Sequence, residues 1–188
     1  LMERAADKAT FCDMVQMING FKEYYSSHNQ VIYENPSPGN KEGGISTLEE
    51  KSLGCVQKGG QAKITAVLKY GDRCTKEGLN LLTGPGNDIV SCTNMTASGA
   101  HMILFTTGRG TPLGAPVPTI KIASNSLLAG RKANWIDYNA GRILEGLSFE
   151  DSAAELFDLI IRVASGQITK NEEHDYREIA IFKSGVTL

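Results

Sequence analysis

The sequence has 188 residues, of which 41% are apolar and 21% are charged, and its formal net charge is -2. This length and composition predict one globular domain, over residues 1–188, with a proper buried core. The small net charge and the lack of a run of Lys and Arg argue against a nucleic-acid partner. No apolar run approaches the ~20 residues that a membrane-spanning helix needs, so we also expect no membrane partner.

The four cysteines, Cys12, Cys55, Cys74 and Cys92, are far apart and form no C-x-x-C pair. Because no secretory signal is recognisable either, we expect reduced thiols and a cytoplasmic location. The first residues, Leu1–Ala5, are typical of the middle of a helix with no cap before it. We therefore expect the sequence to be part of a longer polypeptide.

Four elements are predicted in the first part of the chain: an amphipathic helix over 1–26, an irregular loop over 33–44, a helix over 46–58 and a strand over 62–70. Two prolines and three glycines make regular structure in the loop unexpected, and its polar content suggests a functional loop. Ser46 and Glu49 have the spacing of a capping box at the start of the second helix. Residues 73–83 give no clear pattern.

In the second part, we expect strands over 102–105 and 119–123, because each is a short apolar run bounded by Gly or Pro. Runs of this kind are typical of parallel strands buried on both faces. Further expected elements are short helices over 91–99 and 125–132, a strand over 135–138 followed by a brief helix from Asn139, a long helix over 149–164 and a last strand over 179–182. The long helix has an apolar stripe that includes Phe149 and Phe157, and Ser148 with Asp151 has the spacing of its cap.

The segment between the two central strands contains Gly108, Arg109 and Gly110. Parallel α/β sheets place ligand sites in the loops that follow their strands. The planar guanidinium of Arg109 suits a carboxylate or phosphate, the glycines allow close approach, and Thr107 adds a hydroxyl. A solvated loop arginine is the alternative. The glycines do not form a nucleotide-binding motif.

Other candidates are less specific. Cys55, on the helix that carries Glu50, is a candidate metal ligand or a small buried side chain. Asp88 would orient a base, bind a hydroxyl or cap a turn, and His101 would be a general base or a hydrogen-bonded core residue. Asn125 suits a polyhydroxylated ligand, but also a turn.

Several longer segments resemble one known family. They are N-P-S-P-G-N-K-E-G-G-I-S-T-L-E-E-K-S-L-G-C (35–55), G-P-G-N-D (84–88), L-F-T-T-G-R-G-T-P (104–112), P-T-I-K-I-A-S-N (118–125) and W-I-D-Y-N-A-G-R (135–142). In this order they resemble the C-terminal part of the altronate/galactarate dehydratase family of sugar-acid hydro-lyases. The resemblance covers essentially the whole chain, and the W-I-D-Y-N-A-G form favours the altronate branch.

The resemblance implies an α/β fold, a Rossmann-like three-layer domain with a mainly parallel sheet flanked by helices. It also implies that an N-terminal β-rich domain and an earlier part of the catalytic region are absent here. The implied reaction is the iron-dependent dehydration of altronate to 2-keto-3-deoxygluconate, with Fe2+ replaceable by Mn2+ or another divalent cation, in a full-length chain that forms a homo-oligomer.

That chemistry gives the candidates roles. Removing the proton next to a carboxylate creates a negatively charged enediolate that needs positive charge nearby. Arg109 and Lys58 are expected to bind the carboxylate of a small-molecule sugar acid, with Thr107, Gly108 and Asn125 beside it. His101, Lys121 and Asp88 are the candidate catalytic groups, and Cys55 and Glu50 the candidate iron ligands.

Two alternative functions without catalysis remain open. The chain would be a sugar-acid or anion-binding module without catalysis, or a fragment that docks onto the rest of its polypeptide. Arg109 and its glycines would serve a binding module equally well, whereas only the enzyme would require iron.

Overall fold

The computed structural model describes residues 1–30 and 35–185, which group into two compact units. The N-terminal unit is Leu1–Gly84 together with the segment from Lys183, and the C-terminal unit is Pro85–Phe182. Both contain helices and parallel strands, so the predicted α/β class is confirmed. No helix in the described ranges combines the length and the apolar character that crossing a membrane demands.

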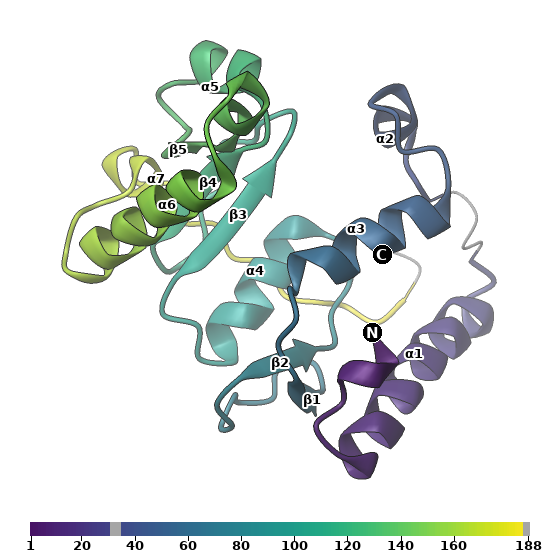
Figure 1. Cartoon of the computed structure of the whole chain (residues 1–188). Coiled ribbons are helices and arrows are strands. Elements are labelled where there is room, and N and C mark those ends of the chain that lie inside the picture. Colours follow the sequence, from purple (N-terminus) through teal and green to yellow (C-terminus); the bar gives the residue numbers. More distant parts are fainter. Residues whose placement is uncertain (31–34, 186–188) are drawn as a thin grey trace. The chain divides into compact units, whose positions relative to one another are not determined.

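The described part of the N-terminal unit contains a pair of parallel strands and three α-helices, which are labelled in Figure 1. Its elements are a 3-10 turn at Met2–Arg4, α1 at Lys8–Ser27, α2 at Pro38–Glu42, α3 at Leu48–Lys58, β1 at Ile64–Leu68 and β2 at Leu79–Leu82. The predicted single helix over 1–26 is wrong at its start. Asp7 is the N-cap of α1, and its side chain accepts a 2.7 Å hydrogen bond from the Thr10 backbone N–H, so the helix has a cap within the chain.

Two other expectations for this unit are corrected. The segment 33–44 is not wholly irregular, because Pro38 occupies the first turn of the short helix α2, a position where its missing N–H costs nothing. Tyr33 and Glu34 of the predicted loop lie outside the described residues. The capping box of α3 uses Thr47 and Glu50 rather than Ser46 and Glu49.

The C-terminal unit is built on three parallel strands in the order β3-β4-β5. Its elements are α4 at Asp88–Ala97, β3 at Ile103–Thr107, β4 at Thr119–Ala123, α5 at Ser126–Arg131, β5 at Tyr138–Asn139, a 3-10 helix at Ala140–Glu145, α6 at Phe149–Ala164 and α7 at Lys170–Glu173. β3 and β4 run in register from Ile103 opposite Thr119 to Thr107 opposite Ala123. The predicted parallel pairing of these two runs is confirmed.

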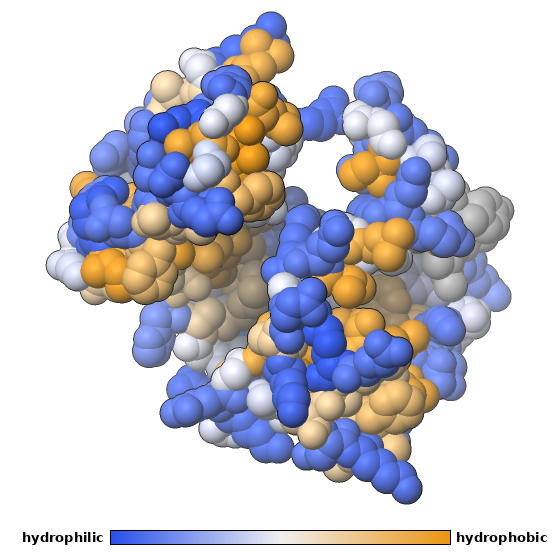
Figure 2. Space-filling view, viewed as in Figure 1, coloured by the Kyte–Doolittle hydropathy of each residue, from blue (hydrophilic) through white to orange (hydrophobic). Residues whose placement is uncertain are grey.

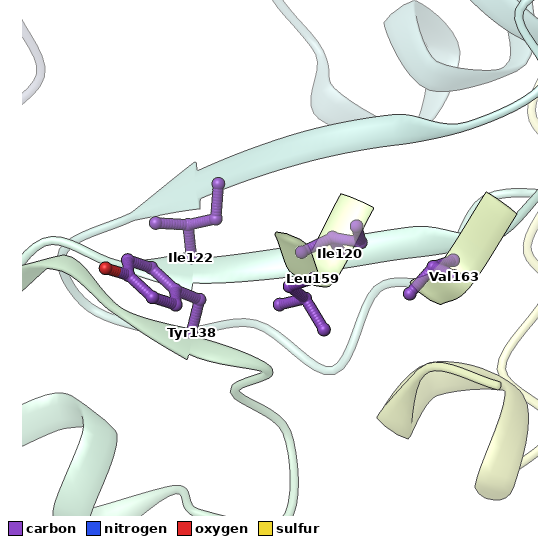
Figure 3. Packing of buried hydrophobic residues seen from close by; sticks show 5 residues of the cluster. All are labelled: Ile120, Ile122, Tyr138, Leu159 and Val163. Atoms are coloured by element: carbon purple, nitrogen blue, oxygen red, sulfur yellow. The ribbon is translucent and has the colours of Figure 1, made fainter. Parts of the chain in front are cut away.

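Helices cover both faces of this sheet (Figure 1). On one face, Ile120 and Ile122 of β4 pack with Tyr138 of β5 and with Leu159 and Val163 of α6, as Figure 3 shows. On the other face, Cys92 of α4 packs in a second cluster with Ile103 and with residues of the segment after β3. All of β4 is buried, as predicted, but β3 is not buried on both faces, because Leu104 is 48% exposed.

The long helix α6 has the predicted bounds, and its Ser148 cap accepts a hydrogen bond from the Asp151 backbone N–H. Its buried face, however, is Ser152, Leu159 and Val163. Phe149 and Phe157 of the predicted stripe are exposed, and Figure 2 shows apolar residues among polar ones on the surface of this unit. The predicted last strand over 179–182 is wrong: Ala180 donates its backbone N–H to the Thr93 hydroxyl instead of to a strand.

Candidate functional site

The turn that follows β3 is fixed by side chains at both of its ends. The hydroxyl of Thr107 accepts a 2.9 Å hydrogen bond from the Gly110 backbone N–H. Gly110 has a φ of +86°, a conformation that glycine adopts without strain. A side chain on Gly110 would also meet the Leu128 side chain at 2.8 Å. Gly110 is therefore required by the shape of the turn.

Asn125 joins this turn to the end of the next strand. Its carboxamide oxygen accepts from the Leu128 backbone N–H at 2.9 Å and so caps α5. Its amide nitrogen donates to the Gly108 carbonyl oxygen at 3.0 Å. Four predicted residues, Thr107, Gly108, Arg109 and Asn125, thus lie together at the carboxyl edge of the sheet, where parallel α/β folds bind ligands.

Arg109 stands exposed on this fixed turn. Among the described residues, no hydrogen bond or ion pair engages its guanidinium. Its five N–H donors are therefore free to bind a planar anion such as a carboxylate.

A hollow of about 330 Å³ opens beside the same segment of chain. Its lining residues come from the start of α4, from the segment after Arg109 and from near the C-terminus: Asn87, Asp88, Ile89, Thr111, Pro112, Leu113 and Glu178. The capping of α4 is done by Asn87, whose side chain accepts from the Ile89 and Val90 backbone N–H groups. The Asp88 carboxylate is consequently not the cap and stays exposed at the hollow.

His101 lies at the other end of the sheet. It precedes β3, whereas Arg109 follows it, and the five residues of β3 span about 16 Å. The imidazole is exposed, so the core alternative does not hold for it. The structure does not bring His101 to the carboxyl edge.

Lys121, in the middle of β4, is fully buried at 0% exposure. Its ammonium donates to the Thr111 carbonyl at 2.5 Å, the Leu113 carbonyl at 2.6 Å and the Asn171 carboxamide oxygen at 3.1 Å. Burial lowers the pKa of Lys121 to about 8, against the opposing effect of the negative charges of Asp137 and Glu178.

The remaining candidates belong to α3 of the N-terminal unit. The Glu50 carboxylate accepts from the Ser46 and Thr47 backbone N–H groups and from the Ser46 hydroxyl, and the Ser46 bonds are the main reason that its pKa is lowered. Cys55 is exposed and follows five residues later, which places it about 140° around the helix from Glu50. Lys58 is the last residue of α3 and is exposed.

These two candidate iron ligands do not form a chelating pair on α3. Across residues 1–30 and 35–185, His, Cys, Asp and Glu side chains nowhere gather in threes in a way suited to a metal ion. All four cysteines are free thiols, as expected. Cys92 is buried, and burial raises its pKa to about 11, so it is not a reactive thiolate at neutral pH.

The sequence groups Asp137 and Asn139 with Asn125 as polar residues at strand ends that suit either a polyhydroxylated ligand or a turn, and it assigns no part to Gly141. The Asp137 carboxylate accepts from the Lys121 backbone N–H at 2.7 Å and from the Lys170 backbone N–H at 2.9 Å. Asn139 donates to the Ser126 hydroxyl and accepts from the Gly141 backbone N–H. A side chain on Gly141 would meet the Asn125 Cα at 2.5 Å. In the sequence, the Asn-x-Gly order of W-I-D-Y-N-A-G is the feature that could have indicated the turn at Asn139 and the close approach of Gly141 to Asn125.

Comparisons with known proteins show relatives that match the chain over its whole length. The family model described as D-galactarate/Altronate dehydratase, C-terminal, matches residues 1–187. The chain is 54% identical over 188 residues to an altronate dehydratase of Escherichia coli and 52% identical over 189 residues to one of Bacillus subtilis. Both matches cover 100% of this chain but 38% of the relative. A galactarate dehydratase (L-threo-forming) of Escherichia coli is 39% identical over 169 residues, covering 89% of this chain and 32% of that protein.

Proposed function

Because the chain belongs to the D-galactarate/altronate dehydratase family, whose C-terminal part it matches, we propose that it is the distal portion of a hydro-lyase that converts altronate to 2-keto-3-deoxygluconate. The observation that carries the proposal is the match over the whole chain at 54% and 52% identity to two altronate dehydratases. The lower identity of 39% to a galactarate dehydratase favours altronate over galactarate as the substrate.

In this proposal Arg109 holds the carboxylate of the sugar acid. The turn that carries it is held by Thr107 and Asn125, so little conformational freedom is lost when the anion binds. The hollow begins two residues further along the chain, at Thr111, and the hydroxyl groups of the substrate would lie against Thr111 and Asp88 there.

The reaction removes the proton from the carbon next to the carboxylate and expels the hydroxyl group from the following carbon as water. The resulting enol rearranges to a ketone when the third carbon takes up a proton. Among the predicted catalytic residues, Asp88 alone has an exposed acid-base group at the hollow, and we assign it the role of base. The positive charge of Arg109 stabilises the enediolate that forms.

A divalent metal, which we propose to be Fe2+ or Mn2+ in its place, would supply Lewis-acid stabilisation of the enediolate and of the departing hydroxyl. The described residues do not assemble a full set of ligands, and the Glu50 carboxylate is occupied by its capping bonds. Cys55, with its exposed free thiol, is the ligand that this chain would contribute. The other ligands would come from the rest of the full-length protein.

The test is an assay of the full-length protein, purified anaerobically, with altronate and galactarate supplied separately and the 2-keto acid product quantified. We expect faster turnover of altronate, loss of activity after exhaustive chelation and recovery on addition of ferrous iron. Absence of altronate turnover in the iron-loaded protein would contradict the proposed function. Undiminished turnover after chelation would contradict the metal requirement alone.

A further inference from the structure

Lys121 is held in place along its whole length. Its backbone N–H donates to the Asp137 carboxylate, and its carbonyl accepts from the Asp137 backbone N–H at 2.9 Å. Its side chain extends from the face of the sheet opposite to Ile120 and Ile122, because neighbouring residues of a strand alternate between faces. The side chain therefore lies on the same side as the segment that follows Arg109.

The ammonium of Lys121 has three N–H donors, and all three are used on protein acceptors. Two of these acceptors are the main-chain carbonyls of Thr111 and Leu113, residues that line the hollow. With no exposed surface, the amine is not placed to contact a substrate directly. This geometry favours a role behind the site rather than the predicted role as base.

The third acceptor, Asn171, is itself fixed and 2% exposed. Its amide nitrogen donates to the Thr119 carbonyl at 3.2 Å, two residues before Lys121 on β4. The next residue along the lined segment, Gly114, donates its N–H to the Glu178 carboxylate at 2.7 Å and accepts from the Glu178 N–H at 2.8 Å. The segment is thus held beyond Leu113 by the hydrogen bonds between Gly114 and Glu178, and Thr107 and Asn125 anchor it before Gly110.

We propose that Lys121 is a positioning residue, whose buried ammonium fixes the path of Thr111–Leu113 and thereby the placement of Arg109 and Thr111 toward the substrate. The expected effect of Lys121 on altronate turnover rests on the proposed function. Its expected effect on the order of Thr111–Leu113 does not. Charged donors form stronger hydrogen bonds than neutral ones, so an uncharged side chain of the same length would not hold both carbonyls.

The experiment uses the full-length protein with Lys121→Met, which keeps the length of the side chain and removes its charge and donors. Lys132→Met is the control, because the Lys132 ammonium lies over the Trp135 ring, 4.4 Å from its centroid, and no hydrogen bond or ion pair among the described residues joins it to the segment. Two quantities are measured: KM and kcat for altronate, and hydrogen–deuterium exchange of the peptide that covers residues 106–115, with the peptide of α6 as an internal reference.

We expect Lys121→Met to raise exchange in 106–115 but not in α6, and to lower kcat/KM about 100-fold with contributions from both KM and kcat, as a displaced binding group does. The control should change neither quantity. Unchanged exchange and kinetics in Lys121→Met would overturn the proposal, and so would an equal rise of exchange in every peptide. If the wild type does not turn over altronate, the proposed function fails while the exchange measurement still tests the positioning role.

If Lys121→Met does not fold, Asn171→Ala tests the positioning role of Lys121, because it removes one of the three acceptors and leaves the ammonium in place. The same local rise in exchange and a smaller fall in kcat/KM, about 10-fold, are expected from the loss of one hydrogen bond. Wild-type exchange over 106–115 in this variant would overturn the proposal.

Discussion

The guanidinium of Arg109 is free to bind an anion because neighbouring residues fix the turn without it. Thr107 closes the turn, Gly110 takes the left-handed conformation that the turn needs, and Asn125 ties the turn to the following strand. None of these contacts uses the guanidinium. An arginine presented in this way binds an anion at a low cost in ordering, because the backbone beneath it is already fixed.

Arg109→Lys in the full-length protein should lower kcat/KM for altronate by about 30- to 100-fold, which corresponds to about 2–3 kcal/mol. Lysine keeps the charge but loses the planar pair of donors that matches a carboxylate. Steady-state kinetics give the result, and Arg131→Lys, at the exposed end of α5, is the matched control. Kinetics equal to those of the wild type would assign Arg109 to a solvated loop.

Cys55 lies exposed on α3, so its replacement should not disturb a core. We expect Cys55→Ser to lower the iron content and activity of the full-length protein, because a hydroxyl is a poor substitute for a thiolate as an iron ligand. The melting temperature of the metal-free protein should barely move. Elemental analysis and thermal unfolding give both quantities.

Cys12→Ser is the control for this change, since Cys12 is an exposed free thiol on α1. Full iron occupancy in Cys55→Ser would remove Cys55 from the set of ligands. An equal loss of iron in Cys12→Ser would show a general effect of thiol removal instead.

At the level of single residues, the sequence predicted the position of the turn around Arg109 better than the surroundings of the proposed acid-base groups. Arg109 between two glycines after an apolar run has a local signature, and so has the Asn125 cap. The partners of Lys121 lie 8 to 50 residues away in sequence, so no local pattern predicts that protein groups accept all three hydrogen bonds of its ammonium. Likewise, the free carboxylate of Asp88 depends on Asn87 taking the cap.

The sequence predicted a helix or strand correctly where a local feature, such as a cap or an apolar repeat, determines its bounds. α6 has a Ser cap and a long apolar repeat, and its bounds follow from these. Its orientation does not: the helix carries apolar residues on two faces, and the sheet buries Leu159 and Val163 while Phe149 and Phe157 stay outside. The same limit explains β3, whose apolar run does not reveal that Leu104 faces solvent.

The contact between the 3-10 helix Ala140–Glu145 and α5 gives a sharp test at this scale. Gly141→Ala would bring its new methyl group to 2.4 Å from the Ser126 backbone nitrogen, so we expect a loss of at least about 2 kcal/mol in the free energy of unfolding. Gly130→Ala, in α5 with open space around it, should instead stabilise by about 0.5–1 kcal/mol. Chemical denaturation of both variants measures the difference. Equal stability of the two would contradict the described packing around Gly141.

For the whole molecule, the chain spans 38% of the length of the altronate dehydratases that it matches. The described residues supply a turn with an exposed arginine, a hollow with an exposed carboxylate and one exposed thiol on α3, but no complete set of metal ligands. We therefore propose that catalysis takes place in the full-length protein, in which this chain binds the substrate carboxylate and removes the proton next to it.

The most direct test of that claim is turnover of altronate by the iron-loaded, full-length protein in D2O, with the product examined by NMR and mass spectrometry. Proton removal beside the carboxylate, loss of the neighbouring hydroxyl and protonation of the enol by solvent require 2-keto-3-deoxygluconate with one deuterium on its third carbon. Asp88→Asn should form this product far more slowly. A product that carries no solvent deuterium on that carbon, or formation at the wild-type rate by Asp88→Asn, would contradict the account.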